Sequence, residues 1–390
     1  MIVVDAAAVP DAYSGARTRL RGLLAAYARL ETAPRLGVLV ARGARLLDGL
    51  ALGTIAVEEG KPPGGPMRRA LSPRLRADAS PLARAARLWH SETIPPRAPA
   101  GVPALLTLHD LRWSEPRWAT GAPWSRWAPR HFAARAWLPR LARSLAAIVT
   151  VSDDSARKIV AHLGVPAERV HVIANATDGD AAAPLDDAAA AALLARLGVA
   201  DTPFLLAVGH LEPRKGLDLV LSALDRAPRD SGLARARLVL VGAGRGEAAL
   251  RARVNEFDLA RRVVFAGPLD DAATATLYGR AAALVFPSRC EGFGFPVHEA
   301  IARGCPVVAR RIGVLADAFG TPGDPRVTLL DDDVSVWTAA LAEQVARPVG
   351  SRQKSPPTSA RAGSWNGPAA ALAALYARLV LGSQGRGTDG

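Results

Sequence analysis

The chain has 390 residues, 49% of them hydrophobic and 22% charged, and its net charge is +13. This length and composition predict a folded protein of two domains, and they exclude a disordered chain, a collagen-like chain and a disulfide-stapled miniprotein. The positive charge comes almost wholly from arginine, which fits either an affinity for anions or a GC-rich genome that favours arginine codons. Cys290 and Cys305 are too few for a disulfide framework, so we expect a reducing, cytoplasmic compartment.

Short apolar runs alternate with helical stretches rich in Ala, Leu and Arg in the first half of the chain. The expected strands are residues 1–4, 36–40, 104–108 and 147–151. The first run lacks a positively charged segment and a long apolar core, so we interpret it as a strand and not as a secretion signal. No segment reaches the ~20 apolar residues that cross a bilayer, so we expect no transmembrane helix.

The same pattern restarts after a polar, alanine-rich break at about residues 178–203. Alternating β and α elements favour parallel sheets with helices on both faces, and therefore an α/β fold with two doubly wound domains facing a cleft. A last helix is expected at about residues 367–381, after a region rich in Pro, Ser and Gly. The expected strands of this half are residues 204–208, 237–241, 263–265, 283–286 and 306–309.

Two carboxylates, Glu291 and Glu299, lie in a glycine-bearing segment directly after an expected strand. Pro296 suits the first turn of a helix and Gly304 suits the residue just past its end. The carboxylates therefore lie at the carboxyl edge of a parallel sheet, where α/β folds bind ligands, beside a helix N-terminus that favours phosphate. Hydroxyl groups of a sugar and of a ribose suit such a pair, although glutamates that only cap a helix would give the same pattern.

A second candidate segment joins the strand at 204–208 to a helix. Gly209 makes a turn, and Arg214 and Lys215 come just before the helix in a chain with only four lysines. Adjacent cations at such a turn suit a pyrophosphate, and a solvated basic turn is the alternative.

Two weaker candidates fall in the first half of the chain. His109 follows the strand at 104–108 directly, where it is either a site residue or a structural histidine. Gly15 lies in a strand-to-helix loop at the same sheet edge. A further glycine turn at residues 242–246 resembles a dinucleotide-binding loop, but its third glycine has the wrong spacing, and we interpret it as a tight strand-to-helix turn.

Taken in order, these motifs resemble family 4 (group 1) of the retaining glycosyltransferases, which have the GT-B fold. The motifs on which this resemblance rests are the E-x7-E element within P-S-x-x-E-G-F-G-x-P-x-x-E-A-x-A-x-G-x-P-V-V, the turn V-G-x-L-x-P-R-K-G and the triplet His109-Asp110-Leu111. Ser364-Trp365-Asn366 resembles the family's C-terminal S-W motif, after which the last helix crosses back to the first domain. The resemblance implies an acceptor-binding domain over 1–180, a linker over 181–202, a nucleotide-sugar-binding domain over 203–363, the crossing helix over 364–381 and a disordered tail over 382–390.

The resemblance also implies roles for single residues. Arg214 and Lys215 would bind the donor pyrophosphate, with Gly209 in the same turn, and Glu299 would hold the ribose. Donor-sugar hydroxyls would bind Glu291 and the backbone of Gly292, Phe293 and Gly294. His109 would face the reacting sugar, and Gly15 would lie against the phosphates or the acceptor.

Three positions depart from the family pattern. His210 stands where many members carry arginine, which makes Arg214 more important here. Asn175-Ala176-Thr177-Asp178 replaces the usual N-G-x-D, and Asp317 takes the place of a glutamate in a donor loop.

The resemblance implies retention of anomeric configuration with no metal and no cofactor, the nucleoside-diphosphate sugar being a substrate. The expected acceptor is a glycan or a lipid-linked molecule, and mannose is the favoured sugar because the V-G-x-L-E-P-R-K turn resembles mannosyltransferase-like members. Residues 112–137 combine tryptophans and arginines, which suits either contact with an inner-leaflet membrane surface or packing on the first domain. The alternatives are an NAD-dependent oxidoreductase, from the 242–246 turn, and a basic non-enzymatic protein that binds nucleic acid or membrane. We expect no nucleic-acid partner, because no nucleic-acid motif is present.

Overall fold

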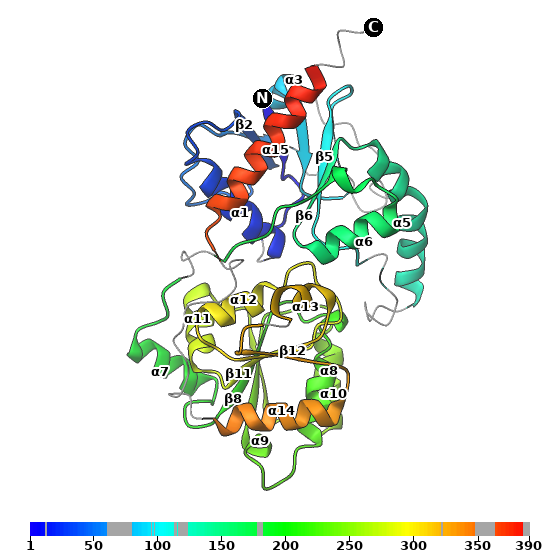
Figure 1. Cartoon of the computed structure of the whole chain (residues 1–390). Coiled ribbons are helices and arrows are strands. Elements are labelled where there is room, and N and C mark those ends of the chain that lie inside the picture. Colours follow the sequence, from blue (N-terminus) through cyan, green and yellow to red (C-terminus); the bar gives the residue numbers. More distant parts are fainter. Residues whose placement is uncertain are drawn as a thin grey trace. The chain divides into compact units, whose positions relative to one another are not determined.

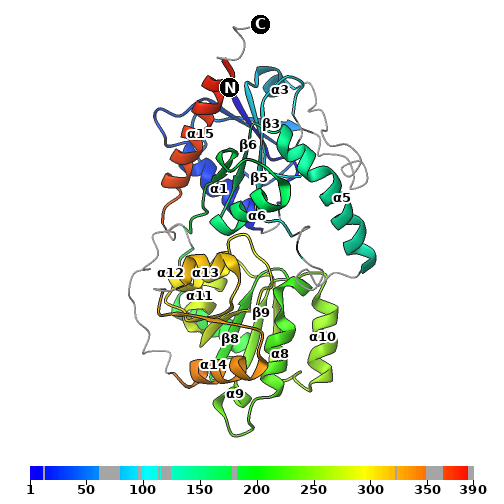
Figure 2. The same cartoon turned by 45° about the vertical axis from the view of Figure 1, so that its right-hand side comes forward.

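The computed structural model describes residues 1–11, 14–60, 80–94, 96, 98–112, 115, 124–177, 182–320, 323–347 and 363–384, without the side chains of 124–130, 133, 134, 383 and 384. The chain divides into two compact units. Unit 1 comprises Met1–Ser114, Ser125–Asp178 and Gly363–Gly390, and unit 2 comprises Glu115–Trp124 and Gly179–Ala362. Figures 1 and 2 show the helices and the sheet of each unit.

Unit 1 is built on a seven-stranded sheet in the order β3-β2-β1-β4-β5-β6-β7, and all of its strand pairs are parallel. Its strands are β1 (Ile2–Asp5), β2 (Leu36–Ala41), β3 (Ala56–Gly60), β4 (Leu88–Ser91), β5 (Ala104–Leu108), β6 (Ala147–Thr150) and β7 (Val170–Val172). Its helices are α1 (Gly15–Tyr27), α3 (Pro81–Ala85), α5 (Trp124–Ser144), α6 (Asp153–Leu163), the short 3-10 helix η1 (Ala167–Arg169) and α15 (Asn366–Gln384).

Unit 2 repeats this plan with a six-stranded parallel sheet in the order β10-β9-β8-β11-β12-β13. Its strands are β8 (Phe204–Val208), β9 (Arg237–Val241), β10 (Val263–Gly267), β11 (Ala283–Phe286), β12 (Val307–Arg310) and β13 (Val327–Leu330). Its helices are α7 (Asp187–Arg196), η2 (Pro213–Lys215), α8 (Leu217–Asp225), α9 (Gly232–Arg235), α10 (Glu247–Glu256), α11 (Asp271–Arg280), α12 (Phe295–Ala302), α13 (Gly313–Phe319) and α14 (Val334–Ala346).

The sheet of unit 2 is buried on both faces because successive side chains of a strand point to opposite faces. Phe204 and Leu206 of β8 pack with α7, α11, α12 and α13, whereas Leu205 and Ala207 pack with α8, α9, α10 and α14. Figure 2 shows α11, α12 and α13 on one side of β8 and β9, and α8 and α10 on the other. Every predicted strand is present, within two residues of its expected bounds at each end.

Four strands were not predicted: β3, β4, β7 and β13. Three of them, β3, β7 and β13, are sheet edges, and β3 ends in Glu58, Glu59 and Gly60. β4 has the sequence Leu-Trp-His-Ser, in which polar groups follow the apolar ones although all four residues are buried. Segments such as β3 and β4, in which polar residues follow apolar ones, carry little strand signal, and β7 and β13 are only three and four residues long.

The last helix, α15, packs on α1 of unit 1 (Figure 1). Trp365 precedes α15 and is 4% exposed. Its indole fills the space beside Gly22 of α1, where an added Cβ would come within 2.2 Å of the ring. The absence of a side chain at Gly22 therefore lets the C-terminal segment dock on α1.

Candidate functional site

The carboxyl ends of β8 and β11 mark the candidate site in unit 2. These strands are neighbours at the point where the strand order of the sheet reverses. Ligands of doubly wound sheets bind in the crevice outside such a switch point. The loop after β8 carries Arg214 and Lys215, and the loop after β11 carries Glu291, so separate parts of the sequence supply this one edge.

The loop after β8 has a backbone that demands glycine at two positions. Gly209 has φ +132° and Gly216 has φ +64°, both unfavourable for other residues. A Cβ on Gly216 would also lie 2.3 Å from the Pro287 carbonyl oxygen. Backbone of the two loops therefore meets directly, and the amide of Arg289 donates to the carbonyl of Arg214 at 2.8 Å.

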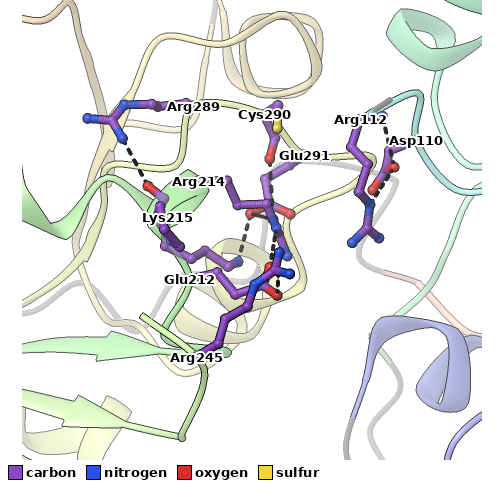
Figure 3. A network of polar contacts seen from close by, with 10 residues as sticks. Asp110, Arg112, Glu212, Arg214, Lys215, Arg245, Arg289, Cys290 and Glu291 are labelled. Carbon is purple, nitrogen blue, oxygen red and sulfur yellow. Dashed lines mark hydrogen bonds and ion pairs between the residues drawn. The ribbon is translucent and has the colours of Figure 1, made fainter. Parts of the chain in front are cut away.

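Three charged side chains converge between these loops (Figure 3). Lys215 Nζ and Arg214 Nη1 donate to the same oxygen of Glu291, Oε1, at 2.7 and 2.9 Å. Glu212 holds the other side of the guanidinium, since Arg214 Nε donates to its Oε2 at 2.9 Å. The side chains of Lys215 and Glu291 are each 12% exposed, so this network is mostly buried but remains in contact with solvent.

Burial and pairing act in opposite directions on the charges of this cluster. Burial would raise the pKa of Glu291, but the cations of Lys215 and Arg214 outweigh it and lower that pKa to about 2. Burial lowers the pKa of Lys215, and Glu291 opposes that shift. Glu291 is therefore ionised at neutral pH and holds both cations in place.

A pocket of about 260 Å³, which includes space open to solvent, lies beside this cluster between β8 and β11. Gly209, His210, Lys215, Phe286 and Ser288 contribute to its lining. The Lys215 ammonium lies 5.0 Å from the centre of the Phe286 ring, a distance at which a cation is attracted to an aromatic face.

The glycine turn after β9 packs against the loop after β8. A Cβ on Gly242 would lie 2.1 Å from the Gly209 carbonyl oxygen, and one on Gly244 would lie 2.5 Å from that of Leu211. The amide of Gly246 donates to the same Leu211 oxygen at 2.8 Å. The turn joins β9 to α10, and its close approach is to the neighbouring loop, so the glycines that suggested a dinucleotide site have a structural reason.

The remaining predicted donor residues of unit 2 lie around the start of α12. Gly294 has φ +90° and precedes the helix. Phe293 is buried and stacks on His298 with ring centres 4.2 Å apart, so its side chain is part of the packing at this end of the sheet. Glu299 accepts a hydrogen bond from Tyr278 Oη at 2.9 Å.

The other predicted residues belong to unit 1. Gly15 is the exposed first residue of α1, whose N-cap Ser14 accepts a hydrogen bond from the Arg17 amide. His109 follows β5, and its Nε2 lies 3.9 Å from Oε2 of Glu92. Burial lowers the pKa of His109 to about 4, with an opposing contribution from Glu92, so the ring is neutral at pH 7.

Sequence reasoning missed a buried polar cluster in unit 1, formed by Arg19, His90, Glu92 and Asn175. Arg19 is fully buried, and its Nη1 donates to the carbonyl of Ile173 and to Oδ1 of Asn175, both at 2.8 Å. The alternation of His90 and Glu92 at the end of β4 is the one signal that a sequence offers, and it was lost because β4 was not predicted.

The tryptophan-rich stretch lies partly outside the described residues. Trp113, Trp118 and the side chains of Trp124 and Trp127 are among those not described. Trp137 of α5 packs against the core of unit 1. No helix among the described residues is long and apolar enough to span a membrane. Within the same residues, no group of three or more His, Cys, Asp or Glu side chains could hold a metal ion.

Comparison with known proteins assigns the family. A family model described as Glycosyltransferase Family 4 matches residues 14–180, and one described as Glycosyl transferases group 1 matches residues 195–324. Both predicted halves are thus matched, in the expected order. The chain belongs to the group 1 (family 4) glycosyltransferases.

Curated relatives in this glycosyltransferase family include two named D-inositol 3-phosphate glycosyltransferase. The protein from Xylanimonas cellulosilytica is 30% identical over 255 residues, covering 60% of this chain and 57% of that protein. The protein from Mycobacterium avium is 31% identical over 242 residues, covering 60% of this chain and 55% of that protein. The chain therefore spans a little over half the length of the curated relatives that it matches.

Solved structures similar to this chain establish the GT-B fold. Anabaena Alr3699/HepE, solved in complex with UDP and glucose, has a TM-score of 0.64 at 18% identity and covers 99% of this chain and 98% of its own. Sucrose-phosphate synthase from Thermosynechococcus elongatus has the same TM-score and identity and covers 98% and 97%.

Proposed function

We propose that this protein is a retaining glycosyltransferase that transfers a hexose from a nucleoside-diphosphate sugar to a glycan or lipid-linked acceptor. The observation that carries the proposal is the pairing of Lys215 and Arg214 with one oxygen of Glu291 at the switch point of unit 2. Adjacent cations suit a pyrophosphate, and a partly buried carboxylate beside them suits sugar hydroxyls.

In this proposal, each part of the nucleoside-diphosphate sugar is bound by named residues. Arg214 and Lys215 bind the pyrophosphate, with Gly209 allowing its close approach. Glu291 and the backbone of residues 292–294 bind the hydroxyls of the donor sugar. Glu299 holds the ribose, and the Tyr278 hydroxyl that donates to it at 2.9 Å fixes its carboxylate. In unit 1, His109 faces the reacting sugar, and Gly15 lies against the phosphates or the acceptor.

The chemistry needs positive charge where the leaving phosphate forms. Breaking the sugar–phosphate bond builds negative charge on that phosphate and makes the sugar oxocarbenium-like. Arg214 and Lys215 are already oriented by Glu291 and Glu212, so they stabilise this charge without reorganising. The acceptor oxygen attacks from the leaving-group face, which retains configuration, and the departing phosphate takes its proton. No metal takes part in this scheme.

The identity of the sugar and of the base follows from weaker signals. The V-G-x-L-E-P-R-K turn favours GDP-mannose. The HepE complex with UDP and glucose makes a UDP-sugar the second candidate. The name of the curated relatives suggests a phosphorylated polyol as a further acceptor to test beside glycans and lipid-linked acceptors of polysaccharide or glycolipid synthesis.

Contact with a membrane surface through residues 112–137 is the remaining part of the proposal. On α5, Phe132 is 60% exposed and Arg135 is exposed, a combination that suits an anionic lipid surface. Co-sedimentation with anionic vesicles should fall when Trp124 and Trp127 are both replaced by alanine. Unchanged co-sedimentation would count against the contact.

Calorimetric titration with GDP, UDP, ADP and NAD, without added metal, tests the main proposal. Micromolar binding of one nucleoside diphosphate is expected and would name the base of the donor. Its loss in Lys215→Ala would link that binding to the site in unit 2. Binding of NAD alone, or of none of the four, would overturn the proposal.

A further inference from the structure

The buried polar cluster of unit 1 lies at a sheet edge like that of the donor site. β1 and β4 are neighbours where the strand order of this sheet reverses. Glu92 directly follows β4, and its amide donates to the carbonyl of Asp5 at 3.2 Å. His109 directly follows β5, the next strand in the sheet. The two side chains therefore meet at the edge where a ligand of unit 1 would bind.

A chain of hydrogen bonds with a fixed direction ends at Glu92. Thr107 Oγ1 donates to Glu92 Oε1 at 3.2 Å, so that hydroxyl is left to accept from His90 Nε2 at 2.8 Å. With its proton on Nε2, the His90 ring accepts on Nδ1 from the Tyr376 hydroxyl at 2.6 Å. Burial lowers the pKa of His90 to about 3, which agrees with a neutral ring in this chain. Each donor proton in this series of hydrogen bonds is already shared with an acceptor, and none of them is donated to the second oxygen of Glu92.

That second oxygen faces His109. Glu92 Oε2 and His109 Nε2 are both buried and lie 3.9 Å apart, and neither atom has a hydrogen-bond partner among the residues that the structure describes. The Glu92 side chain is 1% exposed, whereas 25% of the His109 side chain remains exposed, on parts of the ring other than Nε2. An acceptor without a donor thus faces a ring nitrogen whose proton position is open. A lone pair on Nε2 would leave two acceptors facing each other, which is unfavourable in a buried site.

Other charged groups surround this pair. The guanidinium of Arg19 is fully buried, is bonded to Ile173 and Asn175, and interacts electrostatically with Glu92. Asp110 and Arg112, which also act on His109, are bonded to each other at 3.0 Å and offset one another. With Oε1 already accepting from Thr107, the oxygen Oε2 requires a donor, and His109 Nε2 is the ring nitrogen that faces it.

We infer that Glu92 is a positioning residue that keeps the proton of His109 on Nε2, so that Nδ1 is presented as an acceptor to a hydroxyl of the bound sugar. Apo structures often show such contacts too long, and they shorten when substrate binds. A carboxylate behind the ring also favours positive charge developing on the sugar in front of it. The substrate part of this inference rests on the proposed function, whereas the tautomer does not.

The tautomer is measured by long-range ¹H–¹⁵N NMR of the full chain labelled on histidine, with His109 assigned by His109→Gln. The wild type should show His109 with a protonated Nε2 and an unprotonated Nδ1 at pH 7. Glu92→Gln keeps an acceptor for Thr107 but presents an amide N–H to His109, so the proton should move to Nδ1. Tyr376→Phe, which removes the far end of the chain, should leave the His109 tautomer unchanged.

Kinetics separate positioning from a structural role. Glu92→Gln should lower kcat at least ~10-fold, as for loss of a general acid–base or oxyanion group, and leave the affinity for the nucleoside diphosphate within about twofold. In a His109→Ala background, Glu92→Gln should cause no further loss, because residues that act as one unit are not additive.

The results that would overturn this inference differ from the result that would overturn the proposed function. A wild-type His109 protonated on Nδ1 would overturn the inference without any variant, as would additive losses in the double variant. Failure to bind any nucleoside diphosphate would instead overturn the proposed function, and the tautomer result would stand.

Discussion

Replacement of Lys215 by alanine is the sharpest test of the donor site. The change removes an ammonium group 2.7 Å from Glu291 Oε1 and leaves that carboxylate paired with Arg214 at 2.9 Å. Because one cation remains, Glu291 stays ionised at neutral pH, and the loops after β8 and β11 remain joined through the backbone contact of Arg289 with Arg214. The loss of activity should therefore report on the phosphate and not on unfolding.

The size of the loss follows from what the ammonium group stabilises. One preorganised donor aimed at developing negative charge contributes about 2.7–4 kcal/mol, which is on the order of 10²–10³ in rate. A charge-assisted hydrogen bond to the ground state contributes less, about 1.5–3 kcal/mol. The fall in kcat should thus exceed what the weaker binding of the nucleoside diphosphate explains.

The assay is release of the nucleoside diphosphate from the donor identified by titration, together with calorimetric affinities. Arg245→Ala is the matched control. The Arg245 side chain is 57% exposed and lies 3.5 Å from Glu212, and an ion pair that is this exposed to solvent contributes little. This variant should retain activity within about twofold. Activity of Lys215→Ala within about threefold of the wild type would refute the assignment.

Three further predictions concern packing and pH. Gly244→Ala should cost about 1–3 kcal/mol and weaken nucleoside-diphosphate binding, because its Cβ meets backbone 2.5 Å away, whereas Gly279→Ala, in open space, should not destabilise. Gly22→Ala should also cost about 1–3 kcal/mol, because its Cβ lies 2.2 Å from the Trp365 ring. Acid should destabilise the fold through His90, whose pKa of about 3 lies below the unfolded value of 6.5. The unfolded state binds more protons between these values, so His90 alone should lower the free energy of unfolding by about 2 kcal/mol from pH 8 to pH 5, in addition to the loss from His109, whose pKa is lowered to about 4.

Urea unfolding checks the stabilities, and titration checks nucleotide binding. Equal stability of Gly244→Ala and Gly279→Ala would contradict the support given by the turn after β9. For Gly22, Gly367→Ala is the control because it also lies in open space, and a Gly22→Ala variant as stable as this control would contradict the docking of α15. A pH dependence unchanged in His90→Gln would show that His90 does not cause it.

Much of the donor site could be predicted from the sequence because its signals are local. A strand, a glycine turn and a pair of cations follow one another within residues 204–216, and the same holds for the strand, loop and helix around Glu291. The alternation of β and α elements places both segments at one edge of a parallel sheet. Local signals also gave the last helix, observed as α15.

Other features depend on which strands become neighbours, which a local pattern does not encode. The turn at residues 242–246 had the composition of a dinucleotide site, and only its contact with the loop after β8 shows why it lacks side chains. The direct pairing of Lys215 and Arg214 with Glu291, 76 and 77 positions apart, also required the fold.

The sequence by itself determined the strand–helix alternation, the two-unit plan and the segments that carry the donor residues, because hydrophobic periodicity and turn chemistry act over a few residues. Tertiary structure alone decided that Glu92 lies behind His109. These residues follow different strands, and β4 was not predicted. A buried carboxylate is tolerated only where donors from other elements surround it, and such an environment exists only once the sheet and its helices have packed.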